Sequence, residues 1–501
     1  MPPKERAFFA KPDYELWEAN EAKKEAWLNS MANNDVHQAV GRLILKYHPG
    51  DPEELVTPRG GSYNLVYRLR YKDGTTAALR VPLQHYSHYP EEKLLYEVAL
   101  MKYIRANTTI PIPEVYGFGT AKENPAGNGP FIIMEWVHHH MDLGDALNDP
   151  CGEPEAKQTL DPNISEEKLE SLYEQMAGIL LQLYSLDFPR IGSLVLDDLI
   201  TERNSPGGGS ASVTGRPLIQ NINRITEWTS APQGLLPSNT YARAEEWYSD
   251  MADMHMLQLV FQRNYLVKDE DDARDKYIAR QLFRRLAASG KLSAPSNHND
   301  ASPGRDGPPF KLFSEDLRPN NVLLDEHFKI VAVIDWEFAY AAPAQFARDP
   351  PWWLLIRQPH HWEGGIEAFI AAYEPRLQTF LRTLRRCEAR HEEERESKDA
   401  IDTDKPLSQY MQESWEKKLW IHGLCMRNSW LFDHLFWKFI DPLFFGPNED
   451  CDHKKRLELL TDKERVAMER LVKTKMEEDE ELKVVDWELD PAREHLATFM
   501  V

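Results

Sequence analysis

The alternation of hydrophobic and polar positions is clearest between residues 63 and 71. Large apolar side chains occur at every second position, on one face: Tyr63, Leu65, Tyr67, Leu69 and Tyr71. This period of two predicts a β-strand. The turn sequence Lys-Asp-Gly at 72–74 predicts a hairpin into a second strand over 76–83. Further strands are predicted over 114–119 and 131–137.

Helical periodicity separates and follows these strands. A helix is predicted to begin at Pro90 and to end near Asn107, and its buried stripe consists of Leu94, Val98, Met101 and Ile104. A longer amphipathic helix is predicted after Ser165, which is a suitable N-cap. Residues 1–50 are also predicted to be helical, with Trp17, Trp27, Leu28 and Met31 as anchors. Beyond residue 337 the pattern is mostly helical and rich in tryptophan.

This order of elements predicts an α+β protein with two lobes, a small antiparallel sheet and a larger, mainly helical part. The predicted divisions are a helical extension at 1–50, a strand-rich lobe at 51–138 and a helical lobe at 139–501 that contains a hairpin at 313–337. A ligand site is expected in the cleft between the lobes. The Gly- and Pro-rich stretches 204–217 and 293–309 are predicted to be surface loops.

Charge and cysteine content narrow the class of protein. The formal charge of −22 argues against nucleic acid or an anionic membrane as the main partner. No apolar run approaches the roughly 18–20 residues of a membrane span. The four cysteines form no Cys-x-x-Cys pair, which indicates a reducing compartment without structural zinc. The N-terminal stretch is a poor secretory signal and too acidic for a mitochondrial presequence, so a cytoplasmic location is expected.

Candidate chemistry is concentrated around Asp316, Asn321 and Asp335. Phosphoryl transfer requires mainly positioning and charge neutralisation. Asp316 could accept the proton of an attacking hydroxyl, whereas Asn321 and Asp335 offer the hard oxygen ligands that Mg²⁺ prefers. Arg318 could reach the transferring phosphate. Apolar runs on both sides of a turn at 326–327 predict a hairpin that brings Asn321 and Asp335 together.

The N-terminal lobe supplies possible partners for a phosphate chain. The glycines at 60–64 (Gly-Gly-Ser-Tyr-Asn) let the backbone approach phosphate oxygens. Arg80 faces away from the apolar side of its strand, and Glu97 precedes the buried Val98, so Glu97 could hold Arg80 near the phosphates. Each residue also occurs in ordinary turns and on ordinary surfaces. The prediction therefore depends on their combination.

The apolar stretch 131–137 is predicted to be a core strand that leads into the base-binding edge. In a kinase-like arrangement the backbone of Glu135 and Val137 would bond the adenine, and Met134 would flank it. Leu323 and Ile334 would form the floor under the base.

These segments together resemble the aminoglycoside phosphotransferase family, which is also similar to choline kinases and has the protein-kinase-like fold. The resemblance covers roughly residues 55–365 and is carried by 60–64, 78–81, 131–137, 316–321 and 334–337. The stretch 188–194 is similar to that of a large fungal group within the family. The resemblance implies a kinase that uses ATP or GTP with Mg²⁺ and phosphorylates a hydroxyl of a small molecule. The implied nucleotide-binding residues are Gly60, Gly61, Ser62, Asn64, Val66, Arg80, Glu97, Met134, Glu135, Val137, Leu323 and Ile334.

One departure from the family pattern keeps a second hypothesis open. The family usually has His-Gly-Asp where this chain has Ser314, Glu315 and Asp316. Glu315 adds a like charge near Asp316, and it could crowd the acceptor or contact a cationic one. The alternative is therefore a non-catalytic kinase-like binding protein. A true protein kinase is disfavoured because Trp-Glu replaces Phe-Gly after Asp335. A further family aspartate corresponds loosely to Asp349.

Overall fold

The computed structural model describes residues 4, 6–61, 63–86, 88–151, 158–198, 210–292, 310–395 and 405–501, with the side chains of 394 and 395 left out. The chain divides into two compact units. The first unit comprises Met1–Ala26, Arg216–Gly307 and Lys418–Val501, and the second comprises Trp27–Gly215 and Pro308–Lys417. The division falls within helix α1 (Tyr14–Met31). The domain boundaries at residues 50 and 138 stay predictions.

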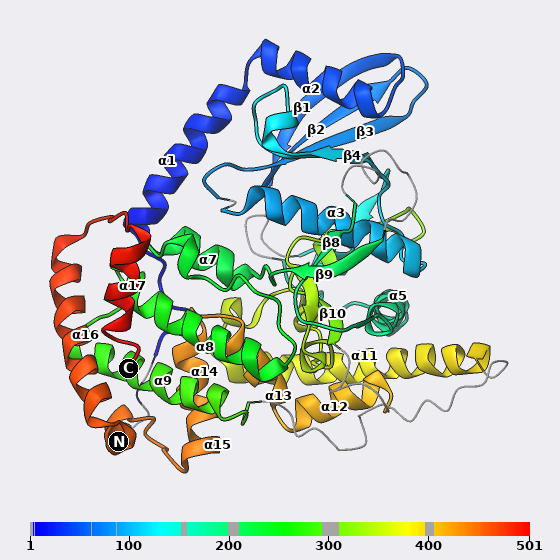
Figure 1. The fold of residues 1–501 in the computed structure, drawn as a ribbon. Helices are drawn as coiled ribbons and strands as arrows, with labels where there is room; N and C mark the ends of the chain where they lie inside the picture. The colour runs from blue at the N-terminus through cyan, green and yellow to red at the C-terminus, as the bar shows by residue number, and fades with distance from the viewer. Residues whose placement is uncertain are drawn as a thin grey trace. The chain divides into compact units, whose positions relative to one another are not determined.

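An antiparallel five-stranded sheet lies in the earlier of the two segments that make up the second unit (Figure 1). Its strands, in spatial order, are β1 (Pro52–Gly60), β2 (Asn64–Tyr71), β3 (Thr76–Pro82), β5 (Phe131–Glu135) and β4 (Val115–Gly119). The predicted alternation on β2 is confirmed, because Leu65, Tyr67, Leu69 and Tyr71 are all buried. The positions of the other predicted strands are confirmed within two residues.

Two helices accompany this sheet. Helix α2 (Asn34–Tyr47) contributes Val40, Leu43 and Ile44 to the core under β2 and β3. Helix α3 (Pro90–Asn107) begins with Pro90 in its first turn, as predicted, and buries the expected stripe. Of the predicted N-terminal anchors, Trp27 is buried in the core of the sheet, but Trp17 is 38% exposed. The prediction for Trp17 is wrong.

Short sheets and longer helices complete the second unit. The strands are β6 (Met141–Asp142), β11 (Val322–Leu324) and β12 (Ile330–Val333) in one sheet, β7 (Asp187–Phe188), β10 (Phe310–Ser314) and β13 (Ala339–Ala342) in another, and the pair β8 (Ser193–Leu196) and β9 (Ala211–Gly215). The helices are α4 (Leu143–Leu147), α5 (Glu166–Tyr184), α10 (Ala344–Ala347), α11 (Gly365–Arg395) and α12 (Leu407–Glu416). Ser165 caps α5 by accepting from the Lys168 amide, as predicted.

Helices α5 and α11 pack side by side in the second unit. Glutamates one turn apart on α5 face arginines on α11, and Glu170 accepts from both Arg382 and Arg386. One loop prediction is partly wrong, because residues 211–215 form strand β9 within the predicted loop 204–217. The predicted loop 293–309 lies outside the described residues.

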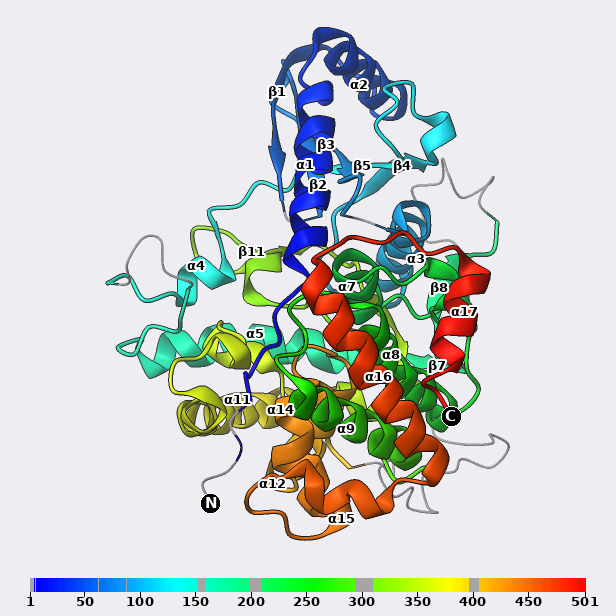
Figure 2. The same cartoon turned by 90° about the vertical axis from the view of Figure 1, so that its left-hand side faces the viewer.

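The first unit is built from helices. They are α7 (Gln220–Trp228), α8 (Ala244–Phe261), α9 (Glu270–Ala288), α13 (Leu419–Met426), α14 (Phe432–Leu435), α15 (Asp441–Phe445), α16 (Asp462–Glu481) and α17 (Leu489–Ala497). Helix α9 packs against both α8 and α16 (Figure 2). The predicted α+β class, a small antiparallel sheet with a larger helical part, is confirmed. Among the described helices, none combines the length and the apolar character that crossing a membrane requires.

Candidate active site

The β11–β12 hairpin brings Asn321 and Asp335 close together in the second unit. Asn321 ends a short 3₁₀ turn directly before β11, and Asp335 follows β12 by two residues. Val322 pairs with Val333, and the Ile334 amide donates to the Asn321 carbonyl at 2.9 Å. The two residues that were predicted to bind metal therefore emerge at the same end of one hairpin.

Asp316 lies beside Asn321 and is connected to it by two contacts. The Asn321 side-chain nitrogen donates to the Asp316 carbonyl at 2.8 Å and to its carboxylate at 3.3 Å. Because the amide nitrogen donates to Asp316, the amide oxygen of Asn321 is the atom suited to a cation. Nε of Arg318 lies 3.4 Å from Oδ1 of Asp316. The structure thus places the predicted base, a predicted metal ligand and the predicted phosphate-binding arginine in one loop.

Arg80 connects the sheet and helix α3 to this loop. Its guanidinium forms an ion pair with Glu97, and Nη1 lies 3.3 Å from Oδ1 of Asp335. The side chains of Arg80 and Glu97 are 9% and 2% exposed, so this pairing is enclosed by protein. The expected pairing of Arg80 with Glu97 is present, and a direct contact to Asp335 is added to it.

The environment of Asp335 favours a cation. Burial and the neighbouring Glu337 raise the pKa of Asp335, Arg80 opposes that rise, and Asp316 adds to it. A divalent cation held by the carboxylate of Asp335 and the amide oxygen of Asn321 would compensate this negative charge. The described residues contain no group of three or more His, Cys, Asp or Glu side chains that could hold a metal alone. These donors therefore fit Mg²⁺ bound jointly by protein and phosphate oxygens.

The glycine-rich turn is compact at its base. The Gly61 amide donates to the Asn64 carbonyl at 2.7 Å. Among the described residues, none would lie within 4 Å of a Cβ atom at Gly60, so the backbone there has open space beside it. The side chain of Asn64 lies near Oε2 of Glu337, at 3.4 Å. Ser62 lies outside the described residues. Val66 pairs with Arg80 across β2 and β3.

The predicted base-binding edge lies at the end of β5. The Glu135 amide donates to the Glu114 carbonyl at 2.8 Å. Nδ1 of His139 lies 3.0 Å from the Val137 carbonyl. Met134 is half-buried at the end of β5. Their roles, and those of Leu323 and Ile334 on the hairpin, stay predictions.

Two structural contacts were not predicted from the sequence. Lys93 forms a buried ion pair with Glu337, with Nζ and Oε2 2.5 Å apart. Its sequence signal is the spacing of Lys93 and Glu97, which places both on one face of α3. In contrast, Asp349 accepts a hydrogen bond from the Ser414 hydroxyl at 2.6 Å, which anchors α12. The loose correspondence of Asp349 to the family aspartate stays a prediction.

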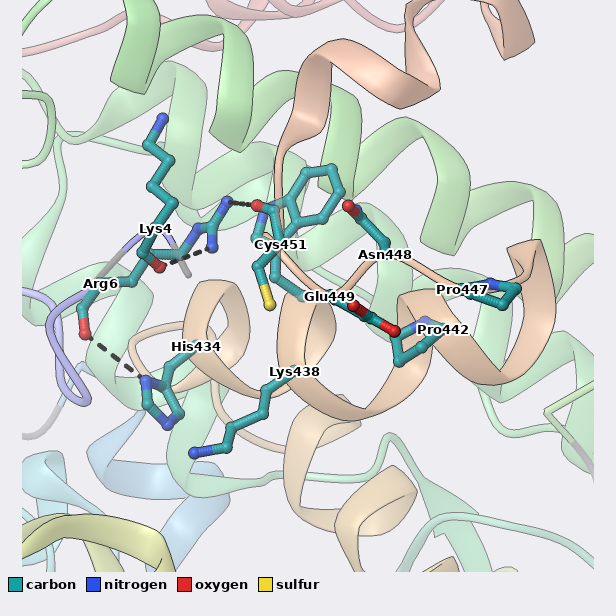
Figure 3. Close-up of a pocket in the computed structure, with 10 residues that line it drawn as sticks. Lys4, Arg6, His434, Lys438, Pro442, Pro447, Asn448, Glu449 and Cys451 are labelled. Carbon is teal, nitrogen blue, oxygen red and sulfur yellow. Dashed lines mark hydrogen bonds between the residues drawn. The ribbon is translucent and has the colours of Figure 1, made fainter. Parts of the chain in front are cut away.

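A cavity of about 700 Å³ lies in the first unit, between the segment around Arg6 and helices α14 and α15 (Figure 3). None of the predicted site residues lines it. Two of its cations are engaged in ion pairs, since Lys4 contacts Asp271 and Arg6 contacts Asp275. The candidate phosphotransfer residues belong instead to the second unit.

A sequence model of the phosphotransferase enzyme family matches residues 54–346, which is more than half of the chain. The chain belongs to this family. The family resemblance is therefore confirmed, and the sheet and hairpin above form the kinase-like phosphotransferase fold. A macrolide 2′-phosphotransferase type I is a structural neighbour with 11% identity and a TM-score of 0.38, covering 84% of this chain and 97% of that chain.

Curated fungal relatives match part of the chain. A protein of Debaryomyces hansenii, "Altered inheritance of mitochondria protein 9, mitochondrial", is 26% identical over 53% of this chain and 44% of its own length. The protein of that name in Clavispora lusitaniae is 22% identical over 60% of this chain and 50% of its own length. The chain thus spans about half the length of the curated relatives it matches. The expectation of a cytoplasmic location is wrong, because both relatives are named mitochondrial.

Proposed function

We propose that this member of the phosphotransferase family is an ATP- and Mg²⁺-dependent kinase that phosphorylates a hydroxyl group of a small molecule. The observation that carries this proposal is the placement of Arg80, which contacts both Glu97 and Asp335. A cation held between a helix carboxylate and a metal-binding carboxylate is the arrangement that orients phosphates in kinase-like sites. Asn321 contacts Asp316 and is joined to the segment of Asp335 by the hydrogen bond from the Ile334 amide to the Asn321 carbonyl.

The chain's own residues would take separate roles in the transfer. ATP supplies the γ-phosphoryl group, and Mg²⁺ neutralises its charge. Asp335 and Asn321 would hold the metal, and Arg80 would position the phosphates. Asp316 would orient the acceptor hydroxyl and take its proton as the oxygen–phosphorus bond forms. Arg318, 3.4 Å from Asp316, would stabilise charge on the transferring group.

The acceptor is proposed to be cationic. Glu315, which is 9% exposed, directly precedes Asp316, and its backbone amide donates to the Phe338 carbonyl at 3.3 Å. A hydrogen bond from this amide fixes the catalytic loop to the segment after Asp335. A second carboxyl beside the predicted base favours an acceptor that carries an amine or quaternary ammonium.

Calorimetry combined with a panel of hydroxyl acceptors tests this proposal. Mg²⁺-dependent ATP binding together with phosphorylation of an amino alcohol supports it. The rival hypothesis, a non-catalytic nucleotide-binding protein, predicts ATP binding without turnover on any acceptor and no effect of Asp316→Asn. GTP in place of ATP in the same titration decides between the two nucleotides.

A mitochondrial location is proposed from the names of the fungal relatives. Import of radiolabelled full chain into isolated mitochondria, with protease protection as the readout, checks it. A chain that stays protease-sensitive outside the organelle would contradict it.

A further inference from the structure

Helix α3 carries two charged side chains toward the metal-binding loop. Lys93 and Glu97 are four residues apart, so they lie on one face of the helix, and both are 3% exposed. Glu97 reaches the loop through Arg80, whereas Lys93 reaches it directly through Glu337. The loop is therefore connected to α3 in two ways, indirectly through Arg80 and directly through the ion pair of Lys93 with Glu337.

The direct connection, the ion pair of Lys93 with Glu337, brings together three segments of the chain. Nζ of Lys93 lies 2.5 Å from Oε2 of Glu337, and that same oxygen lies 3.4 Å from the side-chain nitrogen of Asn64. Nζ also lies 4.9 Å from the ring centre of Tyr63 and 5.1 Å from that of Phe338. We name this cluster of Lys93, Tyr63, Asn64, Glu337 and Phe338 the clasp. It connects the glycine-rich turn, helix α3 and the segment that follows Asp335.

The loop that the clasp holds has an unfavourable backbone. Asp335 has a φ of 60° and Phe338 a φ of 59°, both in the left-handed region. Such a conformation is tolerated at aspartate but is an outlier for a bulky residue such as phenylalanine. Strained residues persist only where the surroundings fix them. Lys93 contacts Glu337, which lies between the two residues with positive φ, and it also contacts Phe338, the second of them. These contacts allow Lys93 to fix the conformation of the loop.

We propose that the clasp positions Asp335 for metal binding, with Lys93 as a positioning residue that acts through Glu337. This inference rests on the proposed function and deepens it. Without Lys93, the buried Glu337 carboxylate loses its cation and the loop loses its tie to α3. The Asp335 carboxylate would then no longer be held in one direction, and Mg²⁺ would bind more weakly together with ATP.

The test measures the Mg²⁺ concentration that gives half-maximal ATP binding, by calorimetry on the full chain. Lys93→Met and Glu337→Gln are each expected to raise this concentration about tenfold. The double variant is expected to be no worse than either single variant, because both changes break the same tie. At saturating Mg²⁺ the kcat of Lys93→Met is expected to stay near that of the wild type.

Lys102→Met is the matched control. Lys102 lies on the same helix, is 6% exposed and sits 5.9 Å from the ring centre of Phe118, so its loss also removes a buried cation. Both lysine variants are expected to lower the melting temperature, but only Lys93→Met is expected to change the Mg²⁺ requirement. A purely structural role for Lys93 would move the melting temperature alone.

Three different outcomes would contradict either the clasp or the proposed function, and each can be told apart from the others. Equal Mg²⁺ requirements for the Lys93 and Lys102 variants would refute the clasp and leave the proposed function intact. A lower Mg²⁺ requirement after Lys93→Met would refute positioning, since it would show that the released Glu337 binds metal itself. Absence of Mg²⁺-dependent ATP binding in the wild type would refute the proposed function and the clasp with it.

Discussion

Nη1 of Arg80 lies 3.3 Å from Oδ1 of Asp335, while the same guanidinium is paired with Glu97. One side chain of the sheet thus connects helix α3 with the loop that carries Asp335, a predicted metal ligand. The fork of a guanidinium makes two directed contacts at once, which the point charge of a lysine cannot do in the same way. If the proposed function holds, this geometry makes Arg80 the residue expected to position the nucleotide.

Replacement of Arg80 is expected to weaken nucleotide binding, and also to destabilise the second unit because it leaves the buried Glu97 carboxylate without its cation. Arg80→Ala removes charge-assisted hydrogen bonds worth about 1.5–3 kcal/mol, so the KM for ATP should rise roughly ten- to a hundredfold. Arg80→Lys should lie between this variant and the wild type. Arg70 on the neighbouring strand, 46% exposed and paired with Glu54, is the control, and Arg70→Ala should leave the KM unchanged. An unchanged KM in Arg80→Ala would contradict the assignment.

Asp316→Asn is expected to lower kcat by about 10²–10⁴-fold, since positioned general bases contribute that much. ATP affinity should change little, because the asparagine keeps the size of the side chain. Asp325→Asn in the turn of the same hairpin is the control. Asp325 accepts from the amides of His327 and Lys329, which an asparagine can also do. Steady-state kinetics with an accepted substrate decide the result, and full turnover in Asp316→Asn would exclude a base at this position.

Glu315→Gln tests the cationic acceptor. If the Glu315 carboxylate attracts the acceptor's positive charge, its loss should raise the KM of an amino alcohol about tenfold, which corresponds to about 1.4 kcal/mol. The KM of a neutral alcohol of the same shape should not change. Equal effects on both acceptors would instead show that Glu315 only supports the loop.

The contacts that the sequence predicts well are local or periodic. The pairing of Arg80 with Glu97 follows from strand alternation and a helical stripe, and the proximity of Asn321 and Asp335 follows from a hairpin. The ion pair of Lys93 with Glu337 joins residues far apart along the chain. The helical spacing places Lys93 on the same face of α3 as Glu97, but it does not identify Glu337 as the partner of Lys93. The hydrogen bond from the Glu135 amide to the Glu114 carbonyl escapes prediction for the same reason.

Residue type alone predicts the structure poorly at strand β9 and at Trp17. Residues 211–215 lie next to a glycine-rich stretch, yet they pair with β8, because tertiary pairing overrides weak strand propensity. Trp17 is expected to be an anchor because of its size, but it is 38% exposed, and the buried positions of α1 are Asn20 and Trp27. Large aromatic residues are often partly exposed, so size alone does not predict burial.

The first unit is expected to depend strongly on Arg280. Its side chain is fully buried, pairs with Asp433 and donates to the His255 carbonyl at 2.8 Å and to Gln258 at 2.8 Å. Arg280→Met leaves Asp433 without this partner, which should lower the free energy of unfolding by about 3–5 kcal/mol. Arg274→Met is the control, since the partly exposed Arg274 pairs with Glu469 at the surface and should contribute at most about 1 kcal/mol. Chemical denaturation of both variants measures the difference.

His422 is expected to make the stability of the first unit fall at mildly acidic pH. The ring is 6% exposed, and burial lowers the pKa of His422 from 6.5 to about 4. The folded state therefore keeps the neutral ring while the unfolded chain binds a proton, so stability is complete above pH 6.5 and declines toward pH 4. The full loss is about 3 kcal/mol for a shift of this size.

Denaturation midpoints measured between pH 7 and pH 4 check this prediction. His422→Phe should flatten the decline, because a phenylalanine cannot bind a proton and can still pack against Phe444, whose ring centre lies 5.8 Å from that of His422. Burial also lowers the pKa of His255, so a smaller decline should remain in this variant. His327→Gln, at a side chain that is 78% exposed, should leave the decline unchanged. Identical profiles for His422→Phe and the wild type would show that His422 does not resist protonation in the folded state.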